Sequence, residues 1–328
     1  MPQNKNPASN YLITSKPHMR SNITTQRLML DVIIALLPAL LVAIINFGAR
    51  GTAVIAVSVI SCVFFEWAYQ KIMKKPVTIN DFSAVITGIL IAFGIPATVP
   101  LWTMVVAAFF AIVIVKQLFG GIGQNFVNPA LAARAFLLAA YPALVTMYDF
   151  GLAYDAIAAP TPLVQFAEAP LYTPGFADMW NILWGFGQTR GAIGEVATIL
   201  IIAGGAYLLI RKVINWRIPV FFIGSTAIML LIFGRHGFMT GQPHYEIFLG
   251  ALMLSAFFMA TDYSTSPMTA LGQVVFGIGC GVITAIIRLW GGFPEGVTYA
   301  ILLMNLLVPL IDKLTKPRVY GAIKGGKT

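Results

Sequence analysis

The chain is organised around F-G-G-I-G-Q-N-F-V-N-P-A, from Phe119 to Ala130, and an apolar run that leads on to Y-D-A-I-A-A-P-T-P-L, from Tyr154 to Leu163. Asn128 and Pro129 predict a helix start, because Asn caps free backbone N–H groups and Pro fits the first helical position. The run continues to Val145, close to the minimum of about 17 residues that crosses a bilayer. We therefore expect the glycine-rich loop and Thr161 to lie on opposite membrane faces.

Composition indicates an all-α polytopic membrane protein. Of 328 residues, 58% are hydrophobic and 10% are charged, and the mean hydropathy is +0.83. Soluble domains have about 25% charged residues. The net charge of +9 is carried by short loops between apolar runs, where basic residues set topology rather than bind nucleic acid. Residues 1–27 are polar, so no signal peptide is expected there.

Apolar runs predict ten membrane spans. These are Leu28–Phe47, Ala53–Ile72, Phe82–Ile95, Leu101–Phe119, Pro129–Val145, Val196–Ile210, Ile218–Phe233, Ile247–Ala260, Leu271–Trp290 and Tyr299–Leu314. The third and eighth are short, and the eighth could be re-entrant.

Basic residues orient the spans. If the N-terminus is cytoplasmic, 16 of the 21 Lys and Arg residues lie in segments on the cytoplasmic side of the membrane. The other five are Arg50, Arg134, Arg190, Arg235 and Arg288. This bias predicts that both termini are cytoplasmic. The expected parts are a cytoplasmic segment (1–27), a first five-helix repeat (28–145), an extracytoplasmic loop (146–194), a second five-helix repeat (195–314) and a cytoplasmic tail (315–328).

The two halves show matching features. Phe119-Gly120-Gly121 follows the fourth span and Trp290-Gly291-Gly292 the ninth, while both short spans end in Pro-containing breaks. Five spans per half would give the halves opposite orientations, and broken helices in inverted repeats indicate a site near the midplane. We expect two inverted five-helix repeats.

The motif Gly120 to Ala130, with Arg134-Ala135-Phe136, Asp155 and Thr161-Pro162-Leu163, resembles the D subunits of the Rnf complex and the homologous B subunits of the sodium-pumping NADH:quinone oxidoreductase. The resemblance covers nearly the whole chain. It implies an electron-relaying subunit of an ion-translocating ferredoxin:NAD+ oxidoreductase in the cell inner membrane, with covalent FMN and non-covalent riboflavin. The implied partners are iron–sulfur and NAD-binding subunits and a flavin transferase.

The resemblance also implies site residues. Thr161 would carry FMN through a phosphoester, and Asp155 would belong to the attachment motif. Taken alone, Thr161 reads as a solvated turn, and Ala158, Ala159 and Pro160 depart from the family's Ser/Thr, Gly and Ala.

Asn125 and Asn128 would contact riboflavin, since an amide offers both a donor and an acceptor. For Asn128, helix capping is the simpler interpretation.

Other residues are weighed on their own chemistry. Asp262, just past the eighth span, is an ion-coupling candidate, a cap for the next helix or a salt-bridged interfacial residue. Glu66 and Asp31 are weaker candidates, because carboxylates near a membrane interior are costly. Cys62 and Cys280 are expected to be buried thiols. His18, His236 and His244 lack metal-ligand spacing.

The chain has no nucleotide-binding glycine motif and no four-cysteine set. We therefore expect NAD and iron–sulfur clusters to reside in partners. Two alternatives remain open: a subunit of the sodium-pumping quinone oxidoreductase, or a small-solute channel of inverted-repeat fold.

Overall fold

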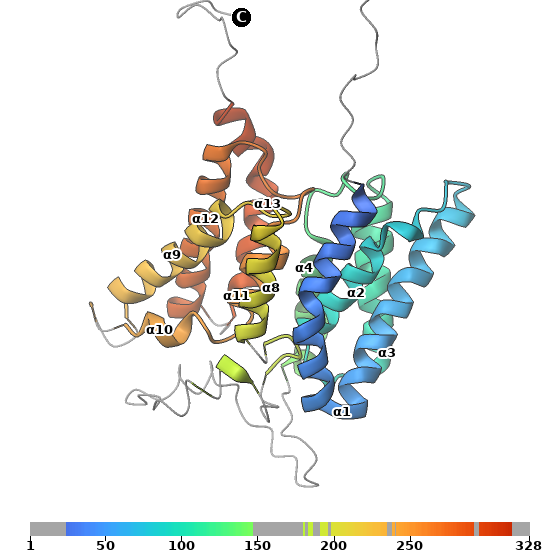
Figure 1. Ribbon diagram of the computed structural model, residues 1–328, viewed down its shortest axis with the longest axis horizontal. Coiled ribbons are helices and arrows are strands. Elements are labelled where there is room, and N and C mark those ends of the chain that lie inside the picture. The colour runs from blue at the N-terminus through green and yellow to red at the C-terminus, as the bar shows by residue number, and fades with distance from the viewer. Residues whose placement is uncertain are drawn as a thin grey trace, which may run out of the picture.

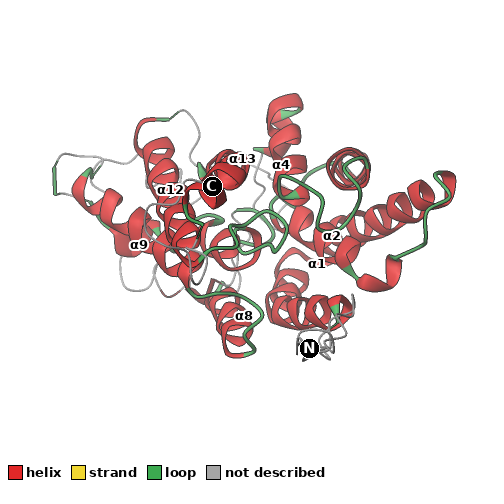
Figure 2. Cartoon of the chain, turned by 90° about the horizontal axis from the view of Figure 1, so that it is seen from above, coloured by secondary structure: helices red, strands yellow, loops and turns green. Residues whose placement is uncertain are grey.

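A computed structural model describes residues 24–146, 180, 183–185, 191–195, 198–234, 238–239, 241–291 and 295–316. All regular secondary structure in these residues is helical (Figures 1 and 2). The helical fold class is confirmed for this part of the chain. Thr161 and Asp155 lie outside the described residues.

Helix α1 (Thr25–Ile72) is a hairpin of two arms rather than one rod (Figure 1). Thr24 caps its start by accepting a hydrogen bond from the Arg27 N–H, and the two arms meet at Gly48, whose φ of 56° and ψ of −144° are non-helical. Glycine adopts such a positive φ without a Cβ penalty. The expected first and second spans are thus these two arms.

The remaining helices form two groups that stand side by side (Figure 1). The first group adds η2 (Ile79–Asp81), α2 (Ser83–Phe93), α3 (Leu101–Phe109), the π-helix η3 (Phe110–Gln117), α4 (Pro129–Ala140) and α5 (Pro142–Val145). The second contains α8 (Thr198–Ile210), α9 (Arg217–Ile232), α10 (Pro243–Glu246), α11 (Leu252–Leu254), the π-helix η4 (Ser255–Met259), α12 (Ala270–Trp290) and α13 (Val297–Leu314). The groups meet where α1 packs on α8 and α4 on α13.

Two expected spans are shorter than the sequence indicated. The fifth breaks at Tyr141, with φ −136° and ψ 54°, because a residue that precedes a proline is driven out of the helical region. The eighth was expected from Ile247, but its helix begins at Leu252, after Gly250 turns the chain with a φ of 72°. Composition alone did not reveal these breaks, since both segments are apolar.

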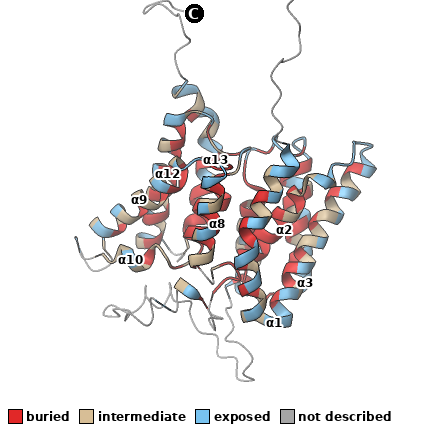
Figure 3. Cartoon of the chain, in the orientation of Figure 1, coloured by how far each residue is buried: buried red, intermediate tan, exposed pale blue. Residues whose placement is uncertain are grey.

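Three described helices are long and apolar enough to cross a membrane: α1, α12 and α13. Helices α2, α4, α8 and α9 and the continuous α3–η3 segment are apolar but shorter. Figure 3 shows exposed positions along the outer faces of the helices. Many exposed residues are large and hydrophobic, for example Ile45, Ile60 and Ile210. A lipid-facing surface has this character.

Glycines let several helices touch through their backbones. A Cβ on Gly88 of α2 would lie 2.6 Å from the Val59 Cα on α1, and one on Gly204 of α8 would collide with the Ala35 carbonyl oxygen of α1. Small residues at helix interfaces allow this approach in membranes, where packing rather than water exclusion holds helices together. Helix α1 is thus closely packed against α2 and α8.

Candidate functional site

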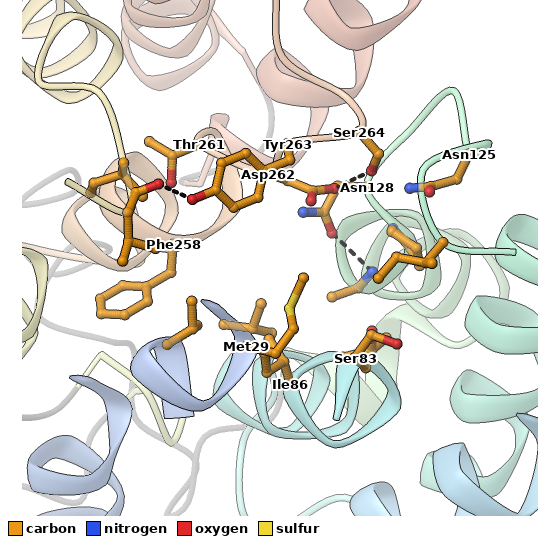
Figure 4. A pocket seen from close by; sticks show the side chains of 18 of the residues that line it. Met29, Ser83, Ile86, Asn125, Asn128, Phe258, Thr261, Asp262, Tyr263 and Ser264 are labelled. Atoms are coloured by element: carbon orange, nitrogen blue, oxygen red, sulfur yellow. Dashed lines mark hydrogen bonds between the residues drawn. The ribbon is translucent and has the colours of Figure 1, made fainter. Parts of the chain in front are cut away.

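A cavity lies between the two helix groups and contains about 750 Å3 of empty space, including its open mouth. Figure 4 shows Met29, Ile86 and Ser83 on one side and the segment Thr261–Ser264 on the other. Asn125 and Asn128, from the glycine-rich loop, complete its wall. We call it the asparagine cavity.

Asn128 builds the cavity wall. Its Oδ1 accepts hydrogen bonds from the backbone N–H groups of Ala130 at 3.0 Å and Leu131 at 3.3 Å. Its Nδ2 donates to the Met259 carbonyl oxygen at 3.1 Å, which ties the start of α4 to the end of η4. The predicted cap is confirmed. These bonds occupy the Oδ1 of Asn128 and one N–H of its Nδ2.

Asn125 keeps more of its amide available. It is buried, and its Nδ2 donates to the Val127 carbonyl at 3.1 Å. Among the described residues, no hydrogen bond is made to its Oδ1. This acceptor belongs to a side chain that lines the cavity, so Asn125 is the stronger candidate contact of the two for a polar ligand edge.

Asp262 follows the end of η4 and lies on the side of the cavity that faces Met29, Ile86 and Ser83 (Figure 4). Its Oδ2 accepts from the Ser264 hydroxyl at 2.9 Å and the Thr265 hydroxyl at 3.3 Å. Burial raises the pKa of Asp262, while these hydroxyls and the Lys116 charge oppose the rise. The carboxylate therefore caps its own turn and also faces the cavity.

A buried ion pair supports the cavity from the side of α1. The Lys116 ammonium, in the π-helix η3, lies 2.8 and 2.9 Å from the two oxygens of Glu66 and 2.7 Å from the Ser83 hydroxyl oxygen. Gln117 also donates to Glu66, at 2.8 Å. A charge inside a membrane protein needs such partners. Sequence reasoning singled out Glu66 but missed Lys116 as its partner.

Several other residues lie away from the cavity. Asp31, near the start of α1, accepts from the Tyr207 hydroxyl at 3.1 Å and pairs with Arg211 at 3.4 Å. Cys62 and Cys280 are both buried free cysteines. Asp31 thus has a structural partner.

A second charged cluster was missed altogether. Arg134 of α4 pairs with Glu195 and Glu295, which precede α8 and α13. The signal was the charge of Arg134 inside an expected span, since such a residue requires a partner. The partners are 61 and 161 residues away, and no local pattern identifies them.

The lining of the asparagine cavity is chemically mixed. Apolar side chains include Leu90, Ile122 and Phe257, and polar ones include Asn125 and Asp262. The structure thus brings Asn125, Asn128 and Asp262 to one cavity, although they come from both halves of the chain.

Comparison with known proteins identifies the family. The chain matches the NQR2, RnfD, RnfE family over residues 12–321. It is 47% identical over 315 residues, 96% of each chain, to the D subunit of the Na(+)-translocating ferredoxin:NAD(+) oxidoreductase complex of Acetobacterium woodii. It is 41% identical over 318 residues to the D subunit of the proton-translocating ferredoxin:NAD(+) oxidoreductase complex of Clostridium ljungdahlii, covering 95% of this chain and 96% of that one. It is 34% identical over 364 residues to the D subunit of the ion-translocating oxidoreductase complex of Aliivibrio salmonicida, covering 96% and 99%. The family and each of these relatives match nearly the full length of the chain. This chain therefore belongs to the NQR2, RnfD, RnfE family.

Proposed function

We propose that this chain is the D subunit of an ion-translocating ferredoxin:NAD+ oxidoreductase in a bacterial or archaeal cytoplasmic membrane. The observation that carries the proposal is the 47% identity, over 96% of both chains, to a subunit with that name. Relatives at 47% and 41% identity are named for different ions, Na+ and H+, so overall similarity does not select the ion. The chain would work with partner subunits that hold iron–sulfur clusters and NAD.

Two flavins would make this chain an electron relay. Riboflavin would occupy the asparagine cavity, and FMN would be attached to Thr161 by a flavin transferase that reads Asp155. The hydrocarbon core is roughly 30 Å thick, so carriers near both faces shorten each electron transfer. The flavins would supply the redox chemistry, and the protein would position and insulate them.

The residues of the asparagine cavity have separate tasks in this proposal. Asn125 would orient the polar edge of the ring through its Oδ1 and its remaining N–H. Asn128 would hold the wall by joining α4 to η4. Asp262, across the cavity, would couple the charge of the ring to ion movement.

The membrane arrangement that we propose has ten spans in two inverted repeats, with both termini cytoplasmic. Two of the described helical segments, α2 and α11–η4, support the inverted repeats. Each is a short helix in the third position of its half, and each is followed by an irregular stretch that contains a proline, Pro96 in one half and Pro267 in the other. Broken helices at equivalent positions place a site at the repeat interface.

The test compares Asn125→Leu with Gln124→Leu, an exposed amide in the same loop. The chain is purified after coexpression with the flavin transferase, and riboflavin and covalent FMN are quantified separately. We expect Asn125→Leu to lose riboflavin and keep covalent FMN, while Gln124→Leu keeps both. Full riboflavin content in Asn125→Leu would refute the assigned site. Lack of ultraviolet fluorescence from the denatured wild-type band would favour the solute-channel alternative.

A further inference from the structure

A buried charge cluster joins the two halves of the chain at a distance from the asparagine cavity. Arg134 lies six residues along α4 from Asn128, a rise of roughly 9 Å. A Cβ on Gly94, at the end of α2, would lie 3.0 Å from the Arg134 Cδ. Glu195 and Glu295 approach Arg134 from the starts of α8 and α13.

One guanidinium serves two carboxyl groups unequally. Arg134 Nη2 forms a close hydrogen-bonded ion pair with Glu295 Oε2, and its Nη1 donates to the Thr298 hydroxyl at 3.3 Å. The distance from Nη2 to Glu195 Oε1 is 3.9 Å, which is beyond hydrogen-bond reach. Arg134 therefore pairs strongly with Glu295 and only weakly with Glu195.

One carboxyl oxygen of the buried Glu195 has no donor in the described part of the chain. Its side chain is 7% exposed, and its Oε1 receives no hydrogen bond within the described part of the chain. The Glu295 carboxyl lies at the same Arg134 Nη2 as Glu195, and two carboxylates are both acceptors. A proton on one of them turns the repulsive pair into a hydrogen bond.

We propose that Glu195 and Glu295 hold one exchangeable proton between them, carried on Glu195 and donated to Glu295. Arg134 pairs closely with Glu295, and the proton neutralises the second buried carboxyl group, whose Oε1 lies 3.9 Å from that guanidinium. Release breaks the Glu195 O–H bond, leaves the electron pair on the carboxylate and passes the proton to water. The pair is a proton-binding site that links α4 to the starts of α8 and α13.

The electrostatics of the pair agree with this geometry. Burial, followed by the charge of Glu295, raises the pKa of Glu195 well above its ordinary value. Burial acts in the same direction on Glu295, but the Arg134 charge, the hydrogen bond with Glu195 and the Arg288 charge on α12 hold the pKa of Glu295 down to about 2. Two carboxyl groups that share a site divide in this way, one raised and one lowered.

The inference goes beyond the proposed function and is independent of it, because the isolated chain would hold the proton without flavin or partners. The test is infrared spectroscopy of the purified full-length chain in detergent, titrated with pH. A protonated carboxyl has a carbonyl stretch separate from the carboxylate bands. We expect Glu195→Gln to lose one such band per chain.

Two further variants complete the design. Glu295→Gln should also lose the band, because Arg134 can then pair fully with Glu195 and ionise it. Asp312→Asn, near the other end of α13, should keep it, since Asp312 lies away from the pair and accepts from the Met268 backbone N–H. Spectra of Glu195→Gln and Glu295→Gln that equal the wild-type spectrum would overturn the proposal. If one Glu variant fails to fold, the other decides the question.

Discussion

The Lys116–Glu66 pair allows a quantitative test of how buried charge supports the cavity wall. Lys116→Met keeps the apolar stem and removes the ammonium, so Glu66 loses contacts of 2.8 and 2.9 Å. The two side chains are 3% and 1% exposed, so water cannot replace the lost partner. Removing one member of a buried pair costs about 3–5 kcal/mol. Because Gln117 still donates to Glu66 at 2.8 Å, we expect about 3 kcal/mol.

The double variant Glu66→Gln, Lys116→Met supplies the control. It leaves no buried charge and retains an acceptor for Gln117, so it should recover stability to within about 1 kcal/mol of wild type. Lys313→Met, at an exposed position in the last turn of α13, should change little. The assay is unfolding of the purified chain in mixed detergent with increasing denaturant, followed by circular dichroism. A double variant no more stable than Lys116→Met would refute the reasoning.

Three further outcomes are expected. Thr161→Val should abolish covalent FMN in protein coexpressed with the flavin transferase; FMN still found on the variant by mass spectrometry would contradict the attachment site. Asp262→Asn should lower ion transport by the assembled complex more than its ferredoxin-dependent NAD+ reduction, and equal losses would indicate a structural role. The stabilisation from Glu295, whose folded pKa is about 2, should be present above its unfolded value and be lost as the pH falls through 2. Glu195, whose pKa is raised, should instead give stability that declines as the pH rises through its folded value, and thermal unfolding of Glu195→Gln should lack that decline.

Local chemistry in the sequence predicted local structure well. Asn128 and Pro129 predicted the start of α4, and the structure confirms both the start and the cap. Pro142, inside the apolar run, is a signal for the end of α4. The continuous hydropathy nevertheless favoured a longer span, so the end was not predicted. Hydropathy measures transfer into lipid and carries no information on whether the backbone remains helical.

Pairings between distant residues could not be predicted in the same way. Lys116 and Glu66 are 50 residues apart, and Lys116 was interpreted as a topology signal. It reaches Glu66 from the π-helix η3, a local feature with no sequence signature. The assembly of Asn125 and Asp262 around one cavity also depends on how the two halves pack, which no single segment encodes.

The glycine contacts between α1, α2 and α8 have a mechanical consequence. At Gly88 and Gly204 no side chain cushions the helices, so neither helix can slide along its neighbour without backbone atoms colliding. These backbone contacts fix the position of each helix along its neighbour. In the electron relay that we propose, we therefore expect the arrival of an electron to shift protons and polarise dipoles, while the helices themselves remain in place.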